Sequence, residues 1–421
     1  MAATITTLQD ALREYYLPYA EQLNQEILVY DMFSKQEVSW SGRDAILPVH
    51  VSRNTGVSFI GDGQALPAAG EQGWERLVIN AKFLVGKFQL SGPAIAAAKK
   101  GGAGSLVDYM TGEVDRTMDD VHNAANLASI VGGEVLGYVW EKQNAAVFEY
   151  SGRTTGLSVG GATDTAQLVR LDTYATVGAA TQVNTVTSTS ITFNAPINTG
   201  AVPAGTVMAV VCDAAASTLV GGVAGQFARE LTGINSNLAS EIHFNVPRDT
   251  AGGIPALQSN FLLVDPVNDV YASLTLDRMQ ACFDEINLES GGEPDAILMA
   301  PTMRQEYTSL LVGTASANLY KDVSEAGKGD GGFRQDSLGF NQKPIKVSRH
   351  CPPGTIHFLS TKEWKLCELE APGFSDLDGS ILKSDSVGGA GTDNYSGYYR
   401  IYADVVCQRP NANAVLTGVE F

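Results

Sequence analysis

His350 and the adjacent Cys351 are residues whose types could do chemistry, because an imidazole beside a thiol can supply a base and a nucleophile or two metal ligands. Neither residue has a further His or Cys at metal-ligand spacing, and Pro352 and Pro353 follow directly. We therefore expect a loop before a strand at this place, with no catalytic and no metal-binding role.

Two other segments match part of a binding motif. Lys328 lies in the run Ala-Gly-Lys-Gly-Asp, which lacks both the upstream glycine spacing and the following Ser or Thr of a phosphate-binding loop. Asp376, Asp378 and Gly379 match the start of a calcium loop, but the later acidic ligand of an EF-hand is missing. An HExxH motif is also missing from the sequence. We therefore predict no catalytic residue, no cofactor site and no metal site.

Charge and cysteine usage argue against several classes of protein. Lys and Arg number 28 against 46 Asp and Glu, a formal net charge of −18, whereas a nucleic-acid-binding surface needs clustered cations. The 5 cysteines form no CxxC pair, which argues against a zinc ribbon or a disulfide framework and favours reduced thiols in a cytosol. The sequence has neither a signal-peptide pattern at its start nor an apolar run of about 20 residues, so we expect no membrane association.

Residues 105–132 form the stretch around which the other elements are organised. Apolar residues recur there at steps of three or four, which predicts one amphipathic helix roughly 40 Å long at about 1.5 Å per residue. The stripe consists of Val107, Met110, Val114, Met118, Val121, Ala125, Ala128 and Val131. A core helix of any α+β protein would look the same. Asp119 and Asp120 on this helix are either part of a solvated face or partners for a Lys or Arg of another subunit.

Two predicted strands with a long connection between them precede this helix. Residues 44–53 and 75–90 have partial period-two alternation and predict strands, whereas residues 54–74 between them are rich in Gly and Ala. An isolated two-stranded hairpin is marginal in water, so this one either folds onto its own domain or reaches a neighbouring subunit. For the second alternative the candidate contact residues are Arg53, Asn54, Phe59, Leu66, Pro67 and Glu75.

The remaining pattern is typical of an α+β protein. Residues 1–32 predict a helical arm with too little around it to form a core. Residues 145–212 are rich in Thr and Val and poor in charge, which predicts an inserted β module with strands at 181–193 and 205–212. Thr275 is placed to cap a helix that buries Met279, Cys282, Phe283 and Ile286. Further on, we expect a buried strand at 294–300, a helix from Pro301, and strands at 344–348, 355–359, 364–369 and 398–407.

Several segments, taken in this order, resemble the major capsid protein of tailed bacteriophages. They are residues 49–70, 91–99, 230–234, 294–307, 343–359 and 405–419. The resemblance implies an α+β tailed-phage capsid fold with an N-terminal arm (1–32), an extended β-hairpin loop (33–90) and a peripheral domain with a long spine helix (91–144). An inserted β module (145–229), an axial domain (230–369) and a return to the peripheral domain (370–421) would follow.

The resemblance also implies a function without catalysis. The chain would form hexamers and pentamers that close an icosahedral shell around double-stranded DNA, assembled in the host bacterial cytoplasm and located in the virion capsid. A separate scaffolding protein, a portal and a decoration protein are implied partners. Some relatives crosslink loop lysines, and Lys82 and Lys87 lie in the matching limb without surroundings that support this chemistry. The alternatives are an encapsulin-type compartment with the same fold and, more remotely, a soluble hydrolase with a β accessory domain.

Overall fold

The computed structural model describes most of the chain outside its N-terminal segment and several loops. The described residues are 28–36, 38–62, 64–93, 103–131, 135–144, 146–152, 165–171, 176–187, 189–198, 207–212, 231–239, 242–248, 254, 257–263, 272–313, 338–375, 383–384 and 394–420. The expected helix within residues 1–27, the loop with Lys328 and the turn at Asp376 lie outside these ranges.

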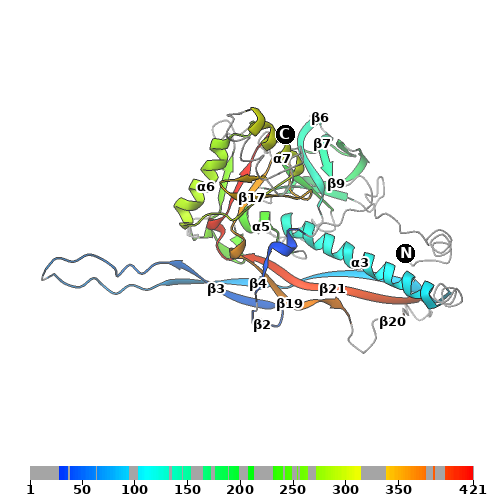
Figure 1. Ribbon diagram of the computed structural model, residues 1–421, viewed down its shortest axis with the longest axis horizontal. Helices are drawn as coiled ribbons and strands as arrows, with labels where there is room; N and C mark the ends of the chain where they lie inside the picture. The colour runs from blue at the N-terminus through cyan, green and yellow to red at the C-terminus, as the bar shows by residue number, and fades with distance from the viewer. Residues whose placement is uncertain are drawn as a thin grey trace, which may run out of the picture.

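An elongated sheet forms the lower part of the molecule in Figure 1. It has five strands: β1 (Ser34–Gln36), β19 (Trp364–Phe374), β21 (Asn394–Cys407) and β20 (Lys383–Ser384) in this order, with β5 (Lys82–Ser91) also paired to β21. The antiparallel pairing of β5 with β21 runs from Ser91 opposite Asn394 to Lys82 opposite Ala403. This sheet joins segments from both ends of the chain.

The long helix predicted at 105–132 is present as α3 (Ala103–Val131) and lies along this sheet (Figure 1). Val121 and Ala125 are buried and Met118 packs against the same core, so the predicted apolar stripe faces the body. Side chains of residues 103–113, which include the expected first-turn cap, lie outside the description. The contact with β5 is close, because a Cβ atom at Gly86 would lie 2.4 Å from a methyl group of Val121.

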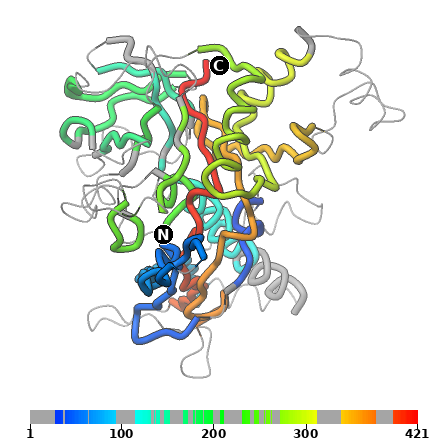
Figure 2. The backbone as a smooth tube through the Cα atoms, turned by 90° about the vertical axis from the view of Figure 1, so that its left-hand side faces the viewer, coloured from blue at the N-terminus to red at the C-terminus, as the bar shows by residue number. Residues whose placement is uncertain are grey.

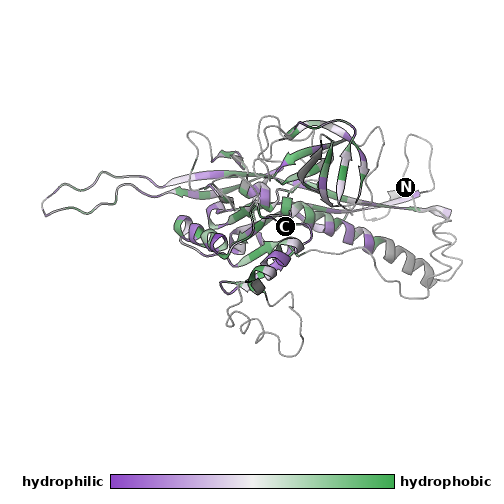
Figure 3. Ribbon diagram, turned by 90° about the horizontal axis from the view of Figure 1, so that it is seen from above, coloured by the Kyte–Doolittle hydropathy of each residue, from purple (hydrophilic) through white to green (hydrophobic). Residues whose placement is uncertain are grey.

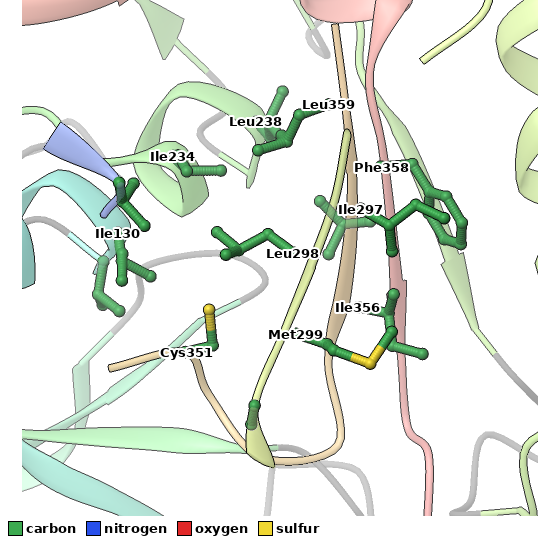
Figure 4. Packing of buried hydrophobic residues seen from close by; sticks show 14 of the residues in the cluster. Ile130, Ile234, Leu238, Ile297, Leu298, Met299, Cys351, Ile356, Phe358 and Leu359 are labelled. Carbon is green, nitrogen blue, oxygen red and sulfur yellow. The ribbon is translucent and has the colours of Figure 1, made fainter. Parts of the chain in front are cut away.

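A six-stranded sheet lies above α3. Its order is β14 (Asn260–Leu263), β22 (Ala414–Thr417), β18 (Ile356–Leu359), β15 (Ala296–Met299), β17 (Lys343–Val347) and β16 (Gly339–Phe340). α5 (Ile234–Ala239), α6 (Leu276–Ser290) and α7 (Pro301–Gly313) pack around it. Figure 4 shows apolar side chains of α3, α5, β15 and β18 meeting in one core. Figure 2 shows α6 and the β module on opposite sides of the molecule.

Local signals placed α6 and β15 correctly. The side chain of Thr275 accepts a hydrogen bond from the backbone N–H of Arg278, and α6 buries Met279, Cys282, Phe283 and Ile286 as predicted. All residues of β15 are buried. The C-terminal part of the chain differs from the expected division, because β22 lies between β14 and β18. Residues 370–421 therefore do not all return to the domain that contains α3.

The β module is a closed barrel. Its strands are β10 (Ser190–Phe193), β7 (Val147–Gly152), β6 (Val135–Asn144), β11 (Met208–Cys212), β8 (Thr165–Arg170) and β9 (Thr176–Val186). The expected start at residue 145 is wrong, because β6 pairs with both β7 and β11. The single strand expected at 181–193 is a hairpin of β9 and β10, since Thr187 and Ser190 form a turn there.

The barrel has its own core and is also docked on the body. Phe148 and Phe193 pack edge to face inside it, among other buried apolar residues. Tyr138 and Val169 point the other way and belong to the main core. The hydroxyl of Tyr138 donates to the carbonyl of His350, which fixes the barrel to the loop before β18.

The extended hairpin consists of β3 (Asp44–Ser52) and β4 (Gly73–Asn80), with β2 (Trp40–Ser41) at its base. Beside this base lies a small hairpin of β12 (Ile242–His243) and β13 (Val246–Pro247). The single limb expected at 75–90 is broken at Ala81, where both Ala81 and Lys82 are buried. Short 3-10 turns occur at η1 (Tyr30–Met32), η4 (Thr361–Glu363) and η5 (Pro410–Ala412).

Candidate subunit interface

The β3–β4 hairpin projects far beyond the rest of the molecule (Figures 1 and 3). Its strands pair antiparallel from Asp44 opposite Asn80 to His50 opposite Trp74, with an irregularity before Ser52. The hairpin therefore has a base that touches the body and a tip, residues 54–70, that extends away from it.

The base packs on its own subunit. Ala45 and Leu47 on β3 and Leu77 and Ile79 on β4 are buried, and they share a core cluster with Phe244, Val246, Leu257, Cys367 and Val406. Trp40 adds a hydrogen bond from its ring N–H to the carbonyl of Glu368 at 3.1 Å. One face of the two strands thus supplies part of the subunit core, as alternation predicts.

A clasp closes the neck of the tip. The side-chain amide of Asn54 donates to the carbonyl of Gly70 at 2.9 Å, and its oxygen accepts from the backbone N–H of Gly56 at 2.6 Å. The two chain segments approach so closely that a Cβ atom at Gly70 would lie 2.5 Å from the Asn54 oxygen. Glycine at this position therefore permits the clasp, and Asn54 organises the tip.

Large apolar side chains beyond the clasp are exposed. Val57 is 85% exposed and Leu66 is 80% exposed, and Phe59 and Ile60 are exposed as well. Pro67 is exposed as well. Burying a Leu or Phe side chain contributes about 1.5–3 kcal/mol relative to leaving it in water, so this tip is a strong candidate for contact with another molecule.

Large apolar side chains are also exposed on the outward face of β3, β4 and β5. Ile46, Trp74, Phe83 and Val85 are each about half exposed or more. Phe83 packs edge to face on Tyr402 with ring centroids 4.9 Å apart. Further along the same face, Lys87 lies over the ring of Tyr398, and Arg400 pairs with Glu370.

The candidate contact residues fall into two places. Asn54, Phe59, Leu66 and Pro67 lie together in the tip, and Arg53 and Glu75 lie just behind it, Arg53 exposed and Glu75 half-buried. Asp119 and Asp120 lie on α3, on the other side of the body from the tip (Figure 1). Asp120 is exposed and Asp119 is half-buried. One subunit therefore does not bring the two groups together.

The sequence reasoning missed part of this surface. Val57 and Ile60 in the tip, and Trp74 and Phe83 on the outward face, were not among the candidates. A signal was available, because residues 74–79 contain large apolar side chains on both faces of the strand (Trp74, Leu77, Val78 and Ile79). In a strand with one face exposed to solvent, apolar residues usually alternate with polar ones.

A buried polar cluster joins β21 and β5 of the elongated sheet to the segment before α5. Asp404 on β21 is 1% exposed and accepts hydrogen bonds from the backbone N–H and the hydroxyl of Thr232. Burial raises the pKa of Asp404 to about 6, while the positive charge of Lys82 and the Thr232 hydrogen bonds act in the opposite direction. Lys82 is itself buried on β5. These groups are buried and connect distant segments, which indicates a structural role.

The His350–Cys351 pair lies in a loop before a strand, as expected. Both residues are buried in the turns before β18, and the His350 ring lies 3.2 Å from the amide oxygen of Asn123. Among the residues that the structure describes, no cluster of His, Cys, Asp or Glu could hold a metal ion. The described helices also include none with the length and apolar character needed to cross a membrane.

Comparison with known proteins identifies the fold. No family model and no curated protein matches the sequence. Among solved structures, a chain of the cyanophage A-1(L) capsid asymmetric unit matches with a TM-score of 0.56 and 10% identity over 99% of both chains. The capsid of a native GTA particle matches with a TM-score of 0.47 and 10% identity over 98% of both chains. The capsid of Myoviridae phage XM1 gives 0.46 and 8% identity over 96% of this chain and 97% of that chain.

The chain therefore has the fold of a phage capsid chain, on the strength of the cyanophage match over nearly its whole length. The fold implied by the sequence resemblance is confirmed at this level. The 10% sequence identity with the cyanophage chain supports a shared fold and nothing more specific.

Proposed function

We propose that this chain is the major capsid protein of a tailed phage, which self-assembles into hexamers and pentamers of an icosahedral shell around double-stranded DNA. The fold it shares with a cyanophage capsid chain supports a shell-building role. The proposal includes no catalytic activity.

The exposed hairpin tip is the observation that carries this proposal. Phe59 and Leu66 lie on a preformed projection that its own subunit does not cover. A copy of the same chain is the partner that a closed shell supplies at every such projection. Arg53, Asn54, Pro67 and Glu75 would flank this contact, and Asp119 and Asp120 would offer acidic partners on the neighbour's α3.

The proposed division into domains follows the resemblance, with three changes. Residues 1–32 form the arm and 33–90 the extended loop, of which β1 and β5 are also strands of the elongated sheet, and α3 with the rest of that sheet forms the peripheral domain. The inserted module begins with β6 instead of at residue 145, the axial domain ends at residue 363 instead of 369, and it includes β22.

An acidic chain is suited to a DNA container. At a formal charge of −18 the wall would repel packaged DNA instead of adsorbing it. A separate scaffolding protein, a portal and a decoration protein are the further partners that we propose. Assembly would take place in the bacterial cytoplasm and the product would be the virion capsid.

Electron microscopy of the purified full-length chain tests the proposal. We expect closed shells or their hexameric and pentameric parts, and, in particles from infected cells, double-stranded DNA inside. Shells that contain only protein cargo would support the encapsulin-type alternative instead. A chain that stays monomeric at all concentrations, with and without a scaffold, would refute a shell function.

A further inference from the structure

The small β12–β13 hairpin has an unusual turn. Phe244 and Asn245 form its two-residue connection with φ angles of 46° and 72°. Both values lie in the left-handed region, as a type I′ turn requires. Asn tolerates this region, but a bulky aromatic residue there is strained, and such strain persists only where the surrounding structure enforces it.

The strained residue contacts the base of the extended hairpin in two ways. The Phe244 ring is 3% exposed and lies in the same core cluster as Leu77 and Ile79 of β4. The Phe244 carbonyl also accepts a hydrogen bond from the backbone N–H of Val78 at 3.3 Å. The ring thus packs with the buried side chains of β4, and the carbonyl bonds to the backbone edge of the same strand, so the turn contacts the base of the hairpin through both side chain and backbone.

Buried polar bonds hold the β12–β13 hairpin in place. The Nε2–H group of His243 donates to the carbonyl of Cys407 at 2.8 Å, and the His243 ring packs edge to face on Phe244. Burial and the charge of Arg248 lower the pKa of His243 to about 3, so the imidazole is neutral at ordinary pH. The Arg248 guanidinium donates to the carbonyl of Asn237 at 2.7 Å.

Asn237 extends the same connections into β21. Its amide donates to the carbonyl of Val405 at 3.2 Å, and its oxygen accepts from the N–H of Cys407 at 3.1 Å. Because β21 is the central strand of the elongated sheet, the β12–β13 turn is tied to the rigid part of the subunit. A displacement of the turn would therefore break buried hydrogen bonds.

We propose that the β12–β13 turn sets the direction in which the extended hairpin leaves the subunit, with Phe244 as the positioning residue. Among the residues that the structure describes, the hairpin contacts the rest of the subunit at its base and then projects away (Figure 1), so a small displacement at Phe244 becomes a large displacement at the tip. The inference concerns a single subunit and does not depend on the proposed shell function.

The test compares glycine substitutions at two similar turns. Phe244→Gly keeps the left-handed backbone without strain and removes the ring. Gln342→Gly is the matched control, because Gln342 has a φ of 63° in the exposed turn between β16 and β17. Spin labels at Ser58→Cys in the tip and Leu288→Cys on α6, in a Cys212→Ser background of the full chain, report the tip-to-body distance by double electron–electron resonance in unassembled protein.

We expect Phe244→Gly to widen the distance distribution and to leave thermal unfolding cooperative, whereas Gln342→Gly leaves the distribution unchanged. Hydrogen exchange of the Val78 amide should be at least about tenfold faster in Phe244→Gly. If Phe244→Gly does not fold, the same measurements on Phe244→Leu test the proposal. This variant retains apolar bulk and should widen the distance distribution by a smaller amount. A folded Phe244 variant with the distribution and the Val78 exchange of the unsubstituted chain would overturn the proposal.

Discussion

The carboxylate of Asp404 on β21 accepts hydrogen bonds from Thr232, at 2.7 Å from the backbone N–H and at 3.1 Å from the hydroxyl. Lys82 on β5 lies near enough for its charge to favour the ionised carboxylate. Cys367 on β19 is the other titratable group facing it, and its own pKa is raised to about 12 by burial and by this carboxylate. The contact joins the segment before α5 to strand β21 of the elongated sheet.

Asp404 should make stability depend on pH. Burial raises its folded-state pKa from 3.8 to about 6, so between these values the folded chain holds a proton that the unfolded chain has released. The contribution of this group to the free energy of unfolding is therefore fully present below about pH 4 and decreases as pH rises through 6, by about 3 kcal/mol.

Urea unfolding at pH 4.5 and pH 7 of the unsubstituted chain and of Asp404→Asn measures this effect. We expect the free energy of unfolding of the unsubstituted chain, relative to that of Asp404→Asn, to be lower at pH 7 than at pH 4.5. Asp284→Asn, an exposed carboxyl on α6, is the control and should show little change. A pH-independent difference for Asp404→Asn would contradict the assignment.

Gly86→Ala should destabilise the contact between α3 and β5. The added methyl group would lie 2.4 Å from Val121 and 3.0 Å from Thr117, so the helix must move or the side chains must leave their rotamers. Overpacking of this kind typically costs about 1–3 kcal/mol. Thermal unfolding should show a lower Tm for Gly86→Ala and a nearly unchanged Tm for Gly292→Ala, where the new methyl group meets only Ser290 at 3.4 Å.

The double substitution Phe59→Ser and Leu66→Ser should impair assembly without unfolding the subunit. Both side chains are exposed in the single chain, so their loss removes no buried contact there. Sedimentation velocity should show fewer large particles at a given concentration, with an unchanged circular dichroism spectrum. Leu288→Ser on α6 removes an equally exposed leucine away from the hairpin and should assemble normally. Normal assembly of the double variant would mean that the tip is not the contact.

Chymotrypsin should cut unassembled chain beside Phe59 or Leu66 but not beside Leu77. The first two residues lie beyond the Asn54 clasp, whereas Leu77 is fully buried in the ladder of β3 and β4. In assembled particles a neighbour should cover the tip, and cleavage there should be slower. Fragment masses by mass spectrometry identify the sites. Equal cleavage rates in both forms would show that no neighbour covers the tip.

The barrel should fold alone, but the body should not tolerate its loss. A fragment of residues 135–229 contains the whole barrel core, and we expect a cooperative thermal transition from it. The full chain without these residues would expose the body surface that Tyr138 and Val169 now cover. We expect lower stability and aggregation, measured by light scattering on heating. A deleted chain as stable as the full one would show that the docking contacts contribute little.

The sequence by itself determined the elements whose signals are local. The Thr275 cap with its buried stripe, the buried run of β15 and the apolar stripe of α3 depend on residues a few positions apart, because helix and strand periodicities relate near neighbours. The first limb of the hairpin and its glycine-rich tip were also predicted, from alternation and composition. The resemblance added the fold, through the order of several segments.

Only the tertiary structure decided which distant segments pair. β22 enters the sheet between β14 and β18, and β6 joins the barrel between β7 and β11. The strained Phe244 and the buried Asn126, which accepts from the backbone N–H groups of Val29 and Tyr30, have no local signature. The physical reason is that a buried polar or strained group is stable only when partners far along the chain satisfy it, and those partners are set by packing.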